Sequence, residues 1–291
     1  HSLGAKILRQ SISALGYSPD FAIYDQEDSD RLVRDCLKEL GSQEKAKAFR
    51  TKISEAKNQL IPPQELKIGF SPIDKLLPDL YSLYQTKLKE FNALDFDDLL
   101  LCFRQILDIE EVREYFHNRF EYFMVDEYQD TNTLQYETIR ILASHSKNLC
   151  VVGDDWQGIY SWRGADISNI LNFKRDYPNA KVINLEENYR STKVIIEAAN
   201  AVIKNNTNQM QKTLFTSNPT GEKIILLDGL DEKHEAEMIA STIKNEENAT
   251  HSDFAILYRT NGQSRLLEEA LIRKNIPYRV YGGVKFYERK E

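Results

Sequence analysis

The sequence predicts an α/β protein in which short parallel strands alternate with helices, preceded by an all-helical region. Up to residue 109, apolar residues recur mainly with a helical period. After Arg119 the pattern changes to short apolar runs at residues 122–125, 149–152 and 182–185, separated by helical segments. This alternation is typical of a parallel sheet in a three-layer α/β domain.

Length and composition narrow the class of protein. The 291 residues are enough for two or three compact domains. With 41% hydrophobic and 29% charged residues, no apolar run of bilayer length and no signal-peptide pattern, we expect a cytoplasmic protein with no membrane partner. Three widely spaced cysteines argue against a zinc site or a disulfide framework. The formal net charge of -7 argues against coating of nucleic acid by bulk electrostatics, but permits a local binding groove.

Five helices are expected before the first strand, at residues 2–15, 28–40, 43–60, 73–90 and 96–109. Gly16 and Gly41 are typical of the ends of the first two helices, and Pro62 follows the third. Asp95 is a suitable N-cap for the last helix. The charged residues of these helices are interpreted as solvated faces rather than binding sites.

The last third of the chain predicts a second α/β unit. A polar loop at residues 204–211 and a turn at 218–221 precede it. Its elements alternate between strand and helix patterns. Strands are expected at 224–227, 254–258 and 278–281, and helices at 235–243 and 264–274.

The first predicted strand ends in two adjacent carboxylates, Asp126 and Glu127. Many nucleotide hydrolases place a magnesium ligand beside a general base in this way. The next strand ends in a Gly-Asp-Asp turn at 153–155, and parallel sheets gather functional groups at such strand ends. The alternative interpretation is a solvated acidic turn after a core strand.

A second constellation lies in the glycine-punctuated loop at residues 153–164. It contains two tryptophans, a tyrosine, a glutamine and an arginine: Trp156, Gln157, Tyr160, Trp162 and Arg163. Such a loop can both sense a phosphate and stack on a nucleobase. The alternative is a set of aromatic plugs in the core, although Gln157 and Arg163 weigh against it.

The third constellation is Tyr189 and Arg190, which follow the predicted strand at 182–185. A tyrosine can stack on adenine, and an arginine can stabilise charge on a transferring phosphoryl group. Alternatively, Arg190 pairs with Glu186 or Glu187 at a helix start.

These three blocks, in this order, resemble superfamily 1 DNA helicases of the UvrD, Rep and PcrA group. Segments 1–9, 94–99, 258–261 and 281–286 also resemble parts of that family, so the resemblance covers nearly the whole chain. It implies RecA-like P-loop NTPase folds, with two partial three-layer parallel sheets and an all-helical accessory domain.

The resemblance also implies a division into domains. Residues 1–18 and 95–183 would form part of the first RecA-like domain. Residues 19–94 would form the helical accessory domain, and 184–291 part of the second RecA-like domain.

The resemblance implies roles in ATP hydrolysis for the matching residues, with ATP and Mg²⁺ as cofactors. Asp126 would coordinate magnesium, and Glu127 would orient and deprotonate the attacking water. Gln157 would contact the γ-phosphate. Tyr189 would stack on adenine, and Arg190 would act as an arginine finger across the cleft between the motor domains.

Other residues would bind the DNA. Tyr160 and Trp162 would stack on bases, and Arg163 would link that surface to the ATP pocket as one of its lining residues. His1, Ser2 and Arg259 are further expected DNA contacts. The implied activity is 3′ to 5′ movement on single-stranded DNA and unwinding of DNA junctions, in repair or replication restart. Trp156 and Gly158 depart from the commonest family residues and receive no role.

The 291 residues contain no G-x-x-x-x-G-K-[ST] phosphate-binding loop. In the family this loop lies upstream of the segment that matches His1. We therefore expect an internal piece of a helicase, with no DNA-stimulated ATPase activity by itself but with weak single-strand binding. The family's central strand would also be absent, so exposed apolar surface and self-association are expected.

Two other interpretations stay open. The chain could be a noncatalytic DNA-binding or partner-binding module that retains the motor fold. It could also be the motor part of a helicase-nuclease, which would require a distal cluster of metal-binding carboxylates.

Overall fold

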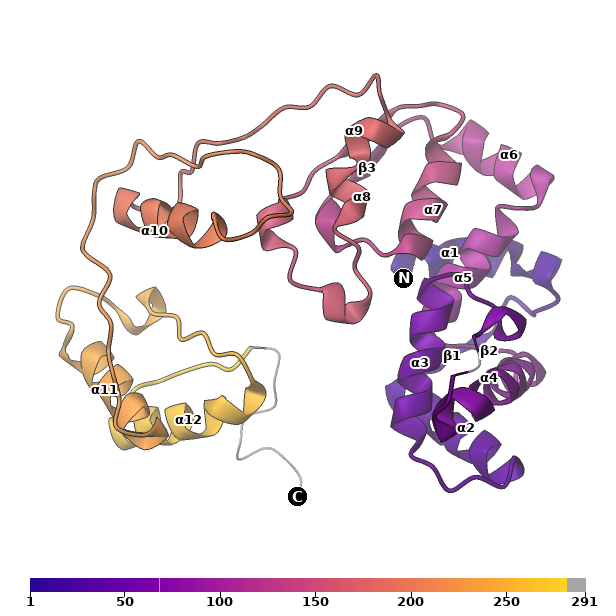
Figure 1. Cartoon of the computed structure of the whole chain (residues 1–291), viewed down its shortest axis with the longest axis horizontal. Coiled ribbons are helices and arrows are strands. Elements are labelled where there is room, and N and C mark those ends of the chain that lie inside the picture. The colour runs from indigo at the N-terminus through magenta and orange to yellow at the C-terminus, as the bar shows by residue number, and fades with distance from the viewer. Residues whose placement is uncertain (68, 282–291) are drawn as a thin grey trace. The chain divides into compact units, whose positions relative to one another are not determined.

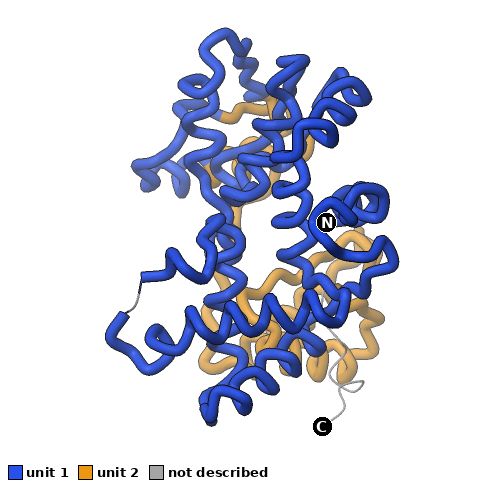
Figure 2. Tube along the Cα trace, turned by 90° about the vertical axis from the view of Figure 1, so that its right-hand side faces the viewer, with its two compact units in different colours: residues 1–186, 200–213 blue, residues 187–199, 214–291 orange. Residues whose placement is uncertain are grey.

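A computed structural model describes residues 1–67 and 69–281 (Figure 1). The chain divides into two compact units, coloured separately in Figure 2. The first contains residues 1–186 and 200–213, and the second contains 187–199 and 214–291. Of residues 281–286, only Tyr281 is among the described residues, and 282–286 lie outside them. No helix within the described ranges is both long enough and apolar enough to span a bilayer.

Three helices form one core of the first unit: α2 (Gln26–Glu39), α3 (Ala46–Asn58) and α4 (Pro72–Glu90). Helix α2 begins two residues earlier than predicted because Asp25 and Asp28 form a reciprocal capping box. Helix α4 begins after Ser71, whose hydroxyl accepts a hydrogen bond from the Asp74 N–H. The side chains that these helices bury include Val33, Phe49, Leu80, Tyr84 and Leu88.

A second core joins α1 (Ser2–Ser11) to α5 (Phe96–Ile106), α6 (Glu110–Arg119) and α7 (Thr133–Ala143). Helix α1 continues as a 3-10 turn to Leu15 and ends at Gly16, whose φ of 76° is left-handed. Helix α1 approaches α5 closely because Gly4 has no side chain. A Cβ there would lie 2.9 Å from the Leu99 carbonyl oxygen. Two short helices, α8 (Ser168–Leu171) and α9 (Phe173–Asp176), complete the first unit.

The first two strands of the predicted sheet are confirmed, each one residue shorter than expected. Strand β3 (Phe123–Val125) pairs in parallel with β4 (Leu149–Val151), with Met124 opposite Cys150. A second parallel pair joins β1 (Ala22–Ile23) to β2 (Ala93–Leu94). The first region was predicted to be wholly helical, and the pair β1–β2 shows that this was wrong. Strands of two residues leave almost no periodic signal in the sequence.

The other predicted strands are not formed in the described chain. Residues 182–185, 224–227, 254–258 and 278–281 carry no strand ladder there, although Glu187 forms a single parallel bridge with Phe215. An apolar run becomes a strand only when a neighbour accepts and donates its backbone hydrogen bonds. The alternation of burial that is typical of a strand is present at 254–258, where every second residue is partly buried and the residues between are exposed.

Helices give the second unit its core. α11 (Glu232–Asn245) packs on α12 (Ser264–Arg273), burying Ala236, Ala240, Ala270 and Leu271. Helix α10 (Lys193–Ile203) begins in the second unit and ends in the first. An α/β architecture with small parallel sheets is thus confirmed in outline.

A buried ionic network ties α3 and α4 to the start of α5. The Lys57 ammonium, fully buried, lies 2.7 Å from Asp95 Oδ2 and 2.8 Å from Asp98 Oδ1. The Tyr84 hydroxyl also donates to Asp95 Oδ2, at 2.9 Å. Asp95 caps α5 through the Asp98 N–H, as predicted.

One lysine cannot fully compensate the charge of two buried carboxylates, so the pKa values of Asp95 and Asp98 shift in opposite directions. Burial raises the pKa of Asp98 to about 7, with the Asp95 charge adding to the effect. Burial opposes ionisation of Asp95 as well, but Lys57, the Asp98 N–H and Tyr84 outweigh it and lower the pKa of Asp95. The pKa of Lys57 is raised, because the two carboxylates outweigh its own burial.

Replacing Lys57 should destabilise the first unit severely. Lys57→Met leaves two buried carboxylates without their cation, which costs about 3–5 kcal/mol. The matched control on the same helix is Lys52→Met. Its ion pair with Asp74 is partly exposed, and its loss should cost about 1 kcal/mol or less. Urea unfolding of both variants measures the difference, and equal losses would contradict the role of the network.

The network should also make stability depend on pH. The folded state holds a proton on Asp98 that the unfolded chain releases above its ordinary pKa of 3.8. The free energy of unfolding therefore falls as pH rises from that value to about 7, by at most about 1.4 kcal/mol per unit. Asp98→Asn should reduce this slope, while the raised pKa values of Asp97 and Asp130 leave a smaller slope of the same sign. Urea titrations across the window test it, and an unchanged slope in the variant would refute the assignment to Asp98.

Candidate nucleotide and DNA site

Asp126 and Glu127 lie exposed at the carboxyl end of β3. The Asp126 carboxylate accepts a hydrogen bond from the Glu127 N–H at 2.9 Å. Glu127 adopts a left-handed conformation, with φ of 51° and ψ of 43°. A non-glycine residue adopts this conformation at a cost, and such strain concentrates at functional sites.

Gln129 connects this strand end to the next one. Its side-chain Nε2 donates to Glu127 Oε2 at 2.7 Å, and its Oε1 accepts from the Asp154 N–H at 3.0 Å. Gln129 is only 2% exposed, so the amide end of both hydrogen bonds is removed from water. Sequence reasoning gave Gln129 no role. The available signal was a polar residue two positions after Glu127, in a segment that follows a short apolar run.

Gly153 allows the two strand ends to approach. A Cβ at this position would lie 2.6 Å from Gln129 Oε1, 2.8 Å from Ile170 Cδ1 and 3.1 Å from the Tyr128 nitrogen. Tyr128 in turn donates its N–H to the Val152 carbonyl at 3.0 Å. Any side chain at Gly153 would therefore push the two loops apart.

Gln157 lies in the loop after β4 and is oriented by Asp154. Its Nε2 donates to Asp154 Oδ2 at 2.9 Å. Lys212 lies 2.6 Å from the other carboxylate oxygen of Asp154. Partial burial opposes ionisation of Asp154, but the hydrogen bonds from Lys212 and Gln157 outweigh it and lower the pKa of that carboxyl.

The aromatic residues of the same loop face solvent. Trp162 is 67% exposed and Tyr160 is 37% exposed, so these rings do not plug the core. Their centroids lie 6.4 Å apart at a tilt of 41°. The Arg163 guanidinium sits 4.5 Å from the Trp162 ring centre and 5.4 Å from that of Tyr160. The three side chains form a cationic and aromatic platform suited to stacking.

Three of the predicted residues line a single pocket of about 410 Å³: His1, Tyr160 and Arg163. Its other polar lining residues were not singled out from the sequence and are Ser54, Asn58, Asp97, Asp130, Asn132 and Gln135. Burial raises the pKa of Asp130, with the Glu127 charge adding to the effect. Ser2 is exposed at the start of α1 and does not line this pocket.

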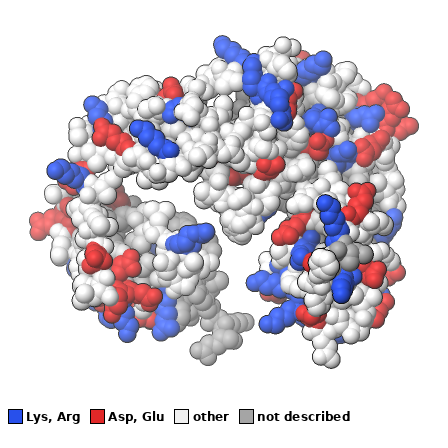
Figure 3. Space-filling view, in the orientation of Figure 1, with Lys and Arg blue, Asp and Glu red and all other residues white. Residues whose placement is uncertain are grey.

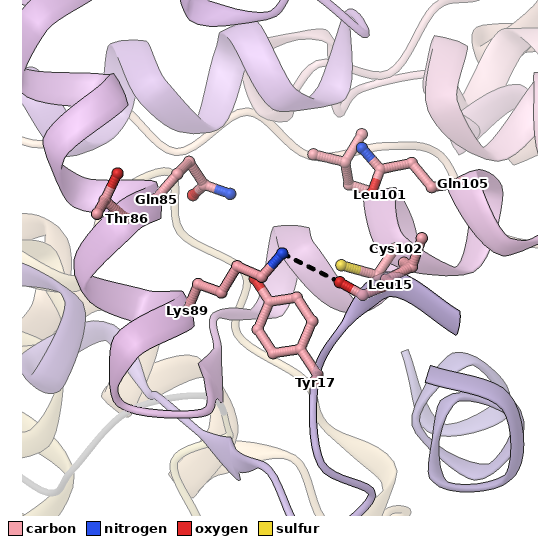
Figure 4. A pocket seen from close by; sticks show the side chains of 8 residues that line it. All are labelled: Leu15, Tyr17, Gln85, Thr86, Lys89, Leu101, Cys102 and Gln105. Atoms are coloured by element: carbon pink, nitrogen blue, oxygen red, sulfur yellow. Dashed lines mark hydrogen bonds between the residues drawn. The ribbon is translucent and has the colours of Figure 1, made fainter. Parts of the chain in front are cut away.

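A second pocket, of about 550 Å³, contains none of the predicted site residues (Figure 4). Lys89 and Tyr17 lie against each other in it, and Lys89 Nζ donates to the Leu15 carbonyl at 3.1 Å. The Gln85 side chain points into the same space and donates to Asp98 at 3.2 Å. This pocket adjoins the buried ionic network rather than the strand ends.

Tyr189, Arg190 and Arg259 belong to the second unit and are exposed. The Tyr189 hydroxyl donates to Glu187 Oε2 at 2.8 Å. Among the described residues, no ion pair joins Arg190 to Glu186 or Glu187, and the Arg190 N–H donates to Asn188 Oδ1 at 3.0 Å. The Arg259 N–H donates to Gln263 Oε1 at 3.0 Å, which fixes the turn before α12.

The surface charge of the first unit is mixed. On the face seen in Figure 3, acidic and basic side chains are interspersed over its helices. This face therefore offers a polyanion individual basic groups rather than one continuous basic surface.

The donor set at β3 fits a magnesium ion that arrives with a nucleotide. Within the described residues, no group of three or more His, Cys, Asp or Glu could hold a metal by itself. Magnesium is usually bound by one or two carboxylates together with water and substrate phosphates. The exposed Asp126 carboxylate beside Glu127 meets that requirement.

Gly153→Ala should destabilise the first unit by about 1–3 kcal/mol, because the new methyl group has no space between Gln129 and Ile170. Gly262→Ala is the control, since no atom lies within 4 Å of a Cβ built there. Chemical denaturation of both variants gives the comparison. Wild-type stability in Gly153→Ala would show that the strand ends are not closely packed.

Comparison with known proteins gives matches along almost the whole chain. Residues 1–178 match the UvrD/REP helicase N-terminal domain, and residues 183–291 match the UvrD-like helicase C-terminal domain. The proteins named ATP-dependent DNA helicase PcrA from Staphylococcus aureus (strain Mu50) and Bacillus subtilis (strain 168) are each 46% identical to it. The alignments include all of this chain, but only 41% and 40% of those two proteins. By these matches, the chain belongs to the UvrD-like helicase family, whose domains have a RecA-like α/β fold.

Proposed function

We propose that this chain forms the DNA-engaging part, and half of the nucleotide pocket, of an ATP-dependent 3′ to 5′ DNA helicase. One observation carries the proposal. The loop after β4 holds Gln157 against Asp154 at the strand end, and a few residues later it presents the exposed Tyr160, Trp162 and Arg163 platform. A nucleotide-dependent shift of this loop would therefore move the stacking platform as well.

The proposed nucleotide chemistry uses the two strand ends. Asp126 would hold the magnesium ion, which supplies neutralisation of phosphate charge when bound. Glu127, oriented by its hydrogen bond from Gln129, would position the attacking water and accept its proton. Gln157 would donate to the terminal phosphate, and Arg163 would link this pocket to the DNA platform.

Two exposed residues of the second unit are proposed as further nucleotide contacts. Tyr189 would stack on adenine, and Arg190 would stabilise the developing phosphoryl charge. The exposure of both side chains supports their availability for a ligand.

The proposed DNA path passes over His1, Tyr160 and Arg163, supported by the single pocket that they line. Ser2 and Arg259 are proposed as further DNA contacts. The partners would be single-stranded DNA and DNA junctions, and the process repair or replication restart.

The finer architecture is part of the same proposal. Residues 1–18 and 95–183 would contribute to one RecA-like three-layer domain and 184–291 to a second. Residues 19–94 would form the helical accessory domain. Exposed apolar side chains such as Met124 and Leu226 support self-association of the chain by itself.

Trp162→Ala tests the DNA platform. Loss of one stacked base should weaken single-strand binding by about 1–3 kcal/mol, which is measurable by fluorescence anisotropy with a labelled oligonucleotide. Phe91→Ala removes another exposed aromatic ring outside the loop and should leave the affinity unchanged. If Trp162→Ala bound as tightly as the wild type, the platform would not be the DNA site.

A further inference from the structure

A segment from late in the chain is anchored to the loop that carries Gln157. Residues 200–213 belong to the first unit, although the chain on either side of them belongs to the second. Lys212 Nζ lies 2.6 Å from Asp154 Oδ1 and 2.6 Å from Asp155 Oδ1. The Met210 N–H donates to the remaining Asp155 oxygen at 2.7 Å. The segment is thus held at two points, by a cation and by a backbone group.

These contacts are shielded from water. The side chain of Lys212 is 15% exposed and that of Asp155 is 2% exposed. The Lys212 ammonium also lies 4.7 Å from the centre of the Trp156 ring. An ion pair covered in this way is screened less by salt than a surface pair such as Arg175 with Asp176.

Asp154 connects Lys212 to Gln157, because its carboxylate bonds to both side chains. One of its carboxylate oxygens accepts from Lys212 and from the Trp156 N–H, while the other accepts from Gln157 Nε2. Its own N–H is fixed by Gln129. A carboxylate held from several sides has one orientation, so it presents its free oxygen to Gln157 in one direction.

Lys212 also lies next to a point where the chain changes units. Thr213 is the last residue of the segment, and its N–H donates to Glu186 Oε1 at 3.0 Å. The chain also crosses between the units from Glu186 to Glu187. Just beyond these two crossings, Glu187 forms a parallel bridge with Phe215. The chain changes units three times, and the crossings at 186–187 and 213–214 therefore run side by side, with Lys212 just before the second of these two.

We propose that Lys212 is a positioning residue that fixes Asp154, and through it Gln157, and so ties one crossing between the units to the nucleotide-sensing loop. We call the contacts of Lys212 with Asp154 and Asp155, and of Asp154 with Gln157, the latch. Its functional role rests on the proposed contact between Gln157 and the terminal phosphate. The latch itself is a property of the chain without nucleotide. The Trp156 ring, whose centre lies 4.7 Å from the Lys212 ammonium, is also part of the latch.

The test compares Lys212→Met, Lys212→Arg and the control Lys204→Met in the ¹⁵N-labelled 291-residue chain. Lys204 is an exposed lysine of the same segment. The readouts are the side-chain amide NMR signals of Gln157 and the pKa of the Asp154 carboxyl. We expect Lys212→Met to shift the amide signals and to raise the Asp154 pKa, because the cation is gone. Lys212→Arg should restore both, and Lys204→Met should change neither.

A second measurement uses the only two tryptophans of the chain. In a Trp162→Phe background, the emission of Trp156 reports on the cation beside its ring. Lys212→Met should change this emission and Lys212→Arg should preserve it. If Lys212→Met does not fold, Lys212→Gln keeps a hydrogen-bond donor without the charge and should give the same shifts.

Unchanged Gln157 signals together with an unchanged Asp154 pKa in a folded, uncharged Lys212 variant would overturn the proposal. Failure of the proposed function has a different signature. In that case the wild-type chain would not bind single-stranded DNA through Trp162, while the signals that report the latch would be unaffected.

Discussion

The parallel pairing of β3 with β4 is the constraint on which the candidate site depends. It brings together two loops that are separated by a whole helix in the sequence, and Gln129 then joins them by bonding to both Glu127 and Asp154. Because the Gln129 amide is buried, a shift of either loop would leave one of its polar atoms without a partner away from water. Gly153 is the steric condition for this arrangement, since any side chain there would occupy the space of the Gln129 oxygen.

Local signals explain what could be predicted from the sequence. The helices follow from apolar periodicity, and the cap of α5 follows from Asp95. Strands β3 and β4 were predictable because each is a short apolar run that ends in acidic residues. The run at 224–227 has the same local character but no ladder in the described chain, and no local signal separates it from a paired strand. Pairing is a long-range property, which a single sequence does not encode in any one segment.

The supporting residues of the site and of the helical core were missed for the same reason. Gln129, Lys212 and Lys57 act through partners 25 to 58 residues away in sequence. Each looks ordinary in its own segment, and charged residues in helices and loops are usually solvated. Their importance comes from burial, because a charge or an amide removed from water must find a partner inside the protein. The exposed residues Asp126, Trp162 and Arg190 were easier to recognise, because their types and order form a pattern.

The site therefore divides into exposed groups and buried supports. Asp126, Glu127 and Trp162 face solvent, where a ligand can reach them, while Gln129 beneath the strand ends is almost inaccessible. This division lets the exposed groups exchange water for a ligand without disturbing the core. It also means that the hydrogen bonds that connect Glu127 to Gln157 run through Gln129 and Asp154. Asp154 is the point where these paths meet, since it bonds to Gln129, Gln157 and Lys212 at once. A substitution at any one of the three partners removes one of the bonds that orient Asp154.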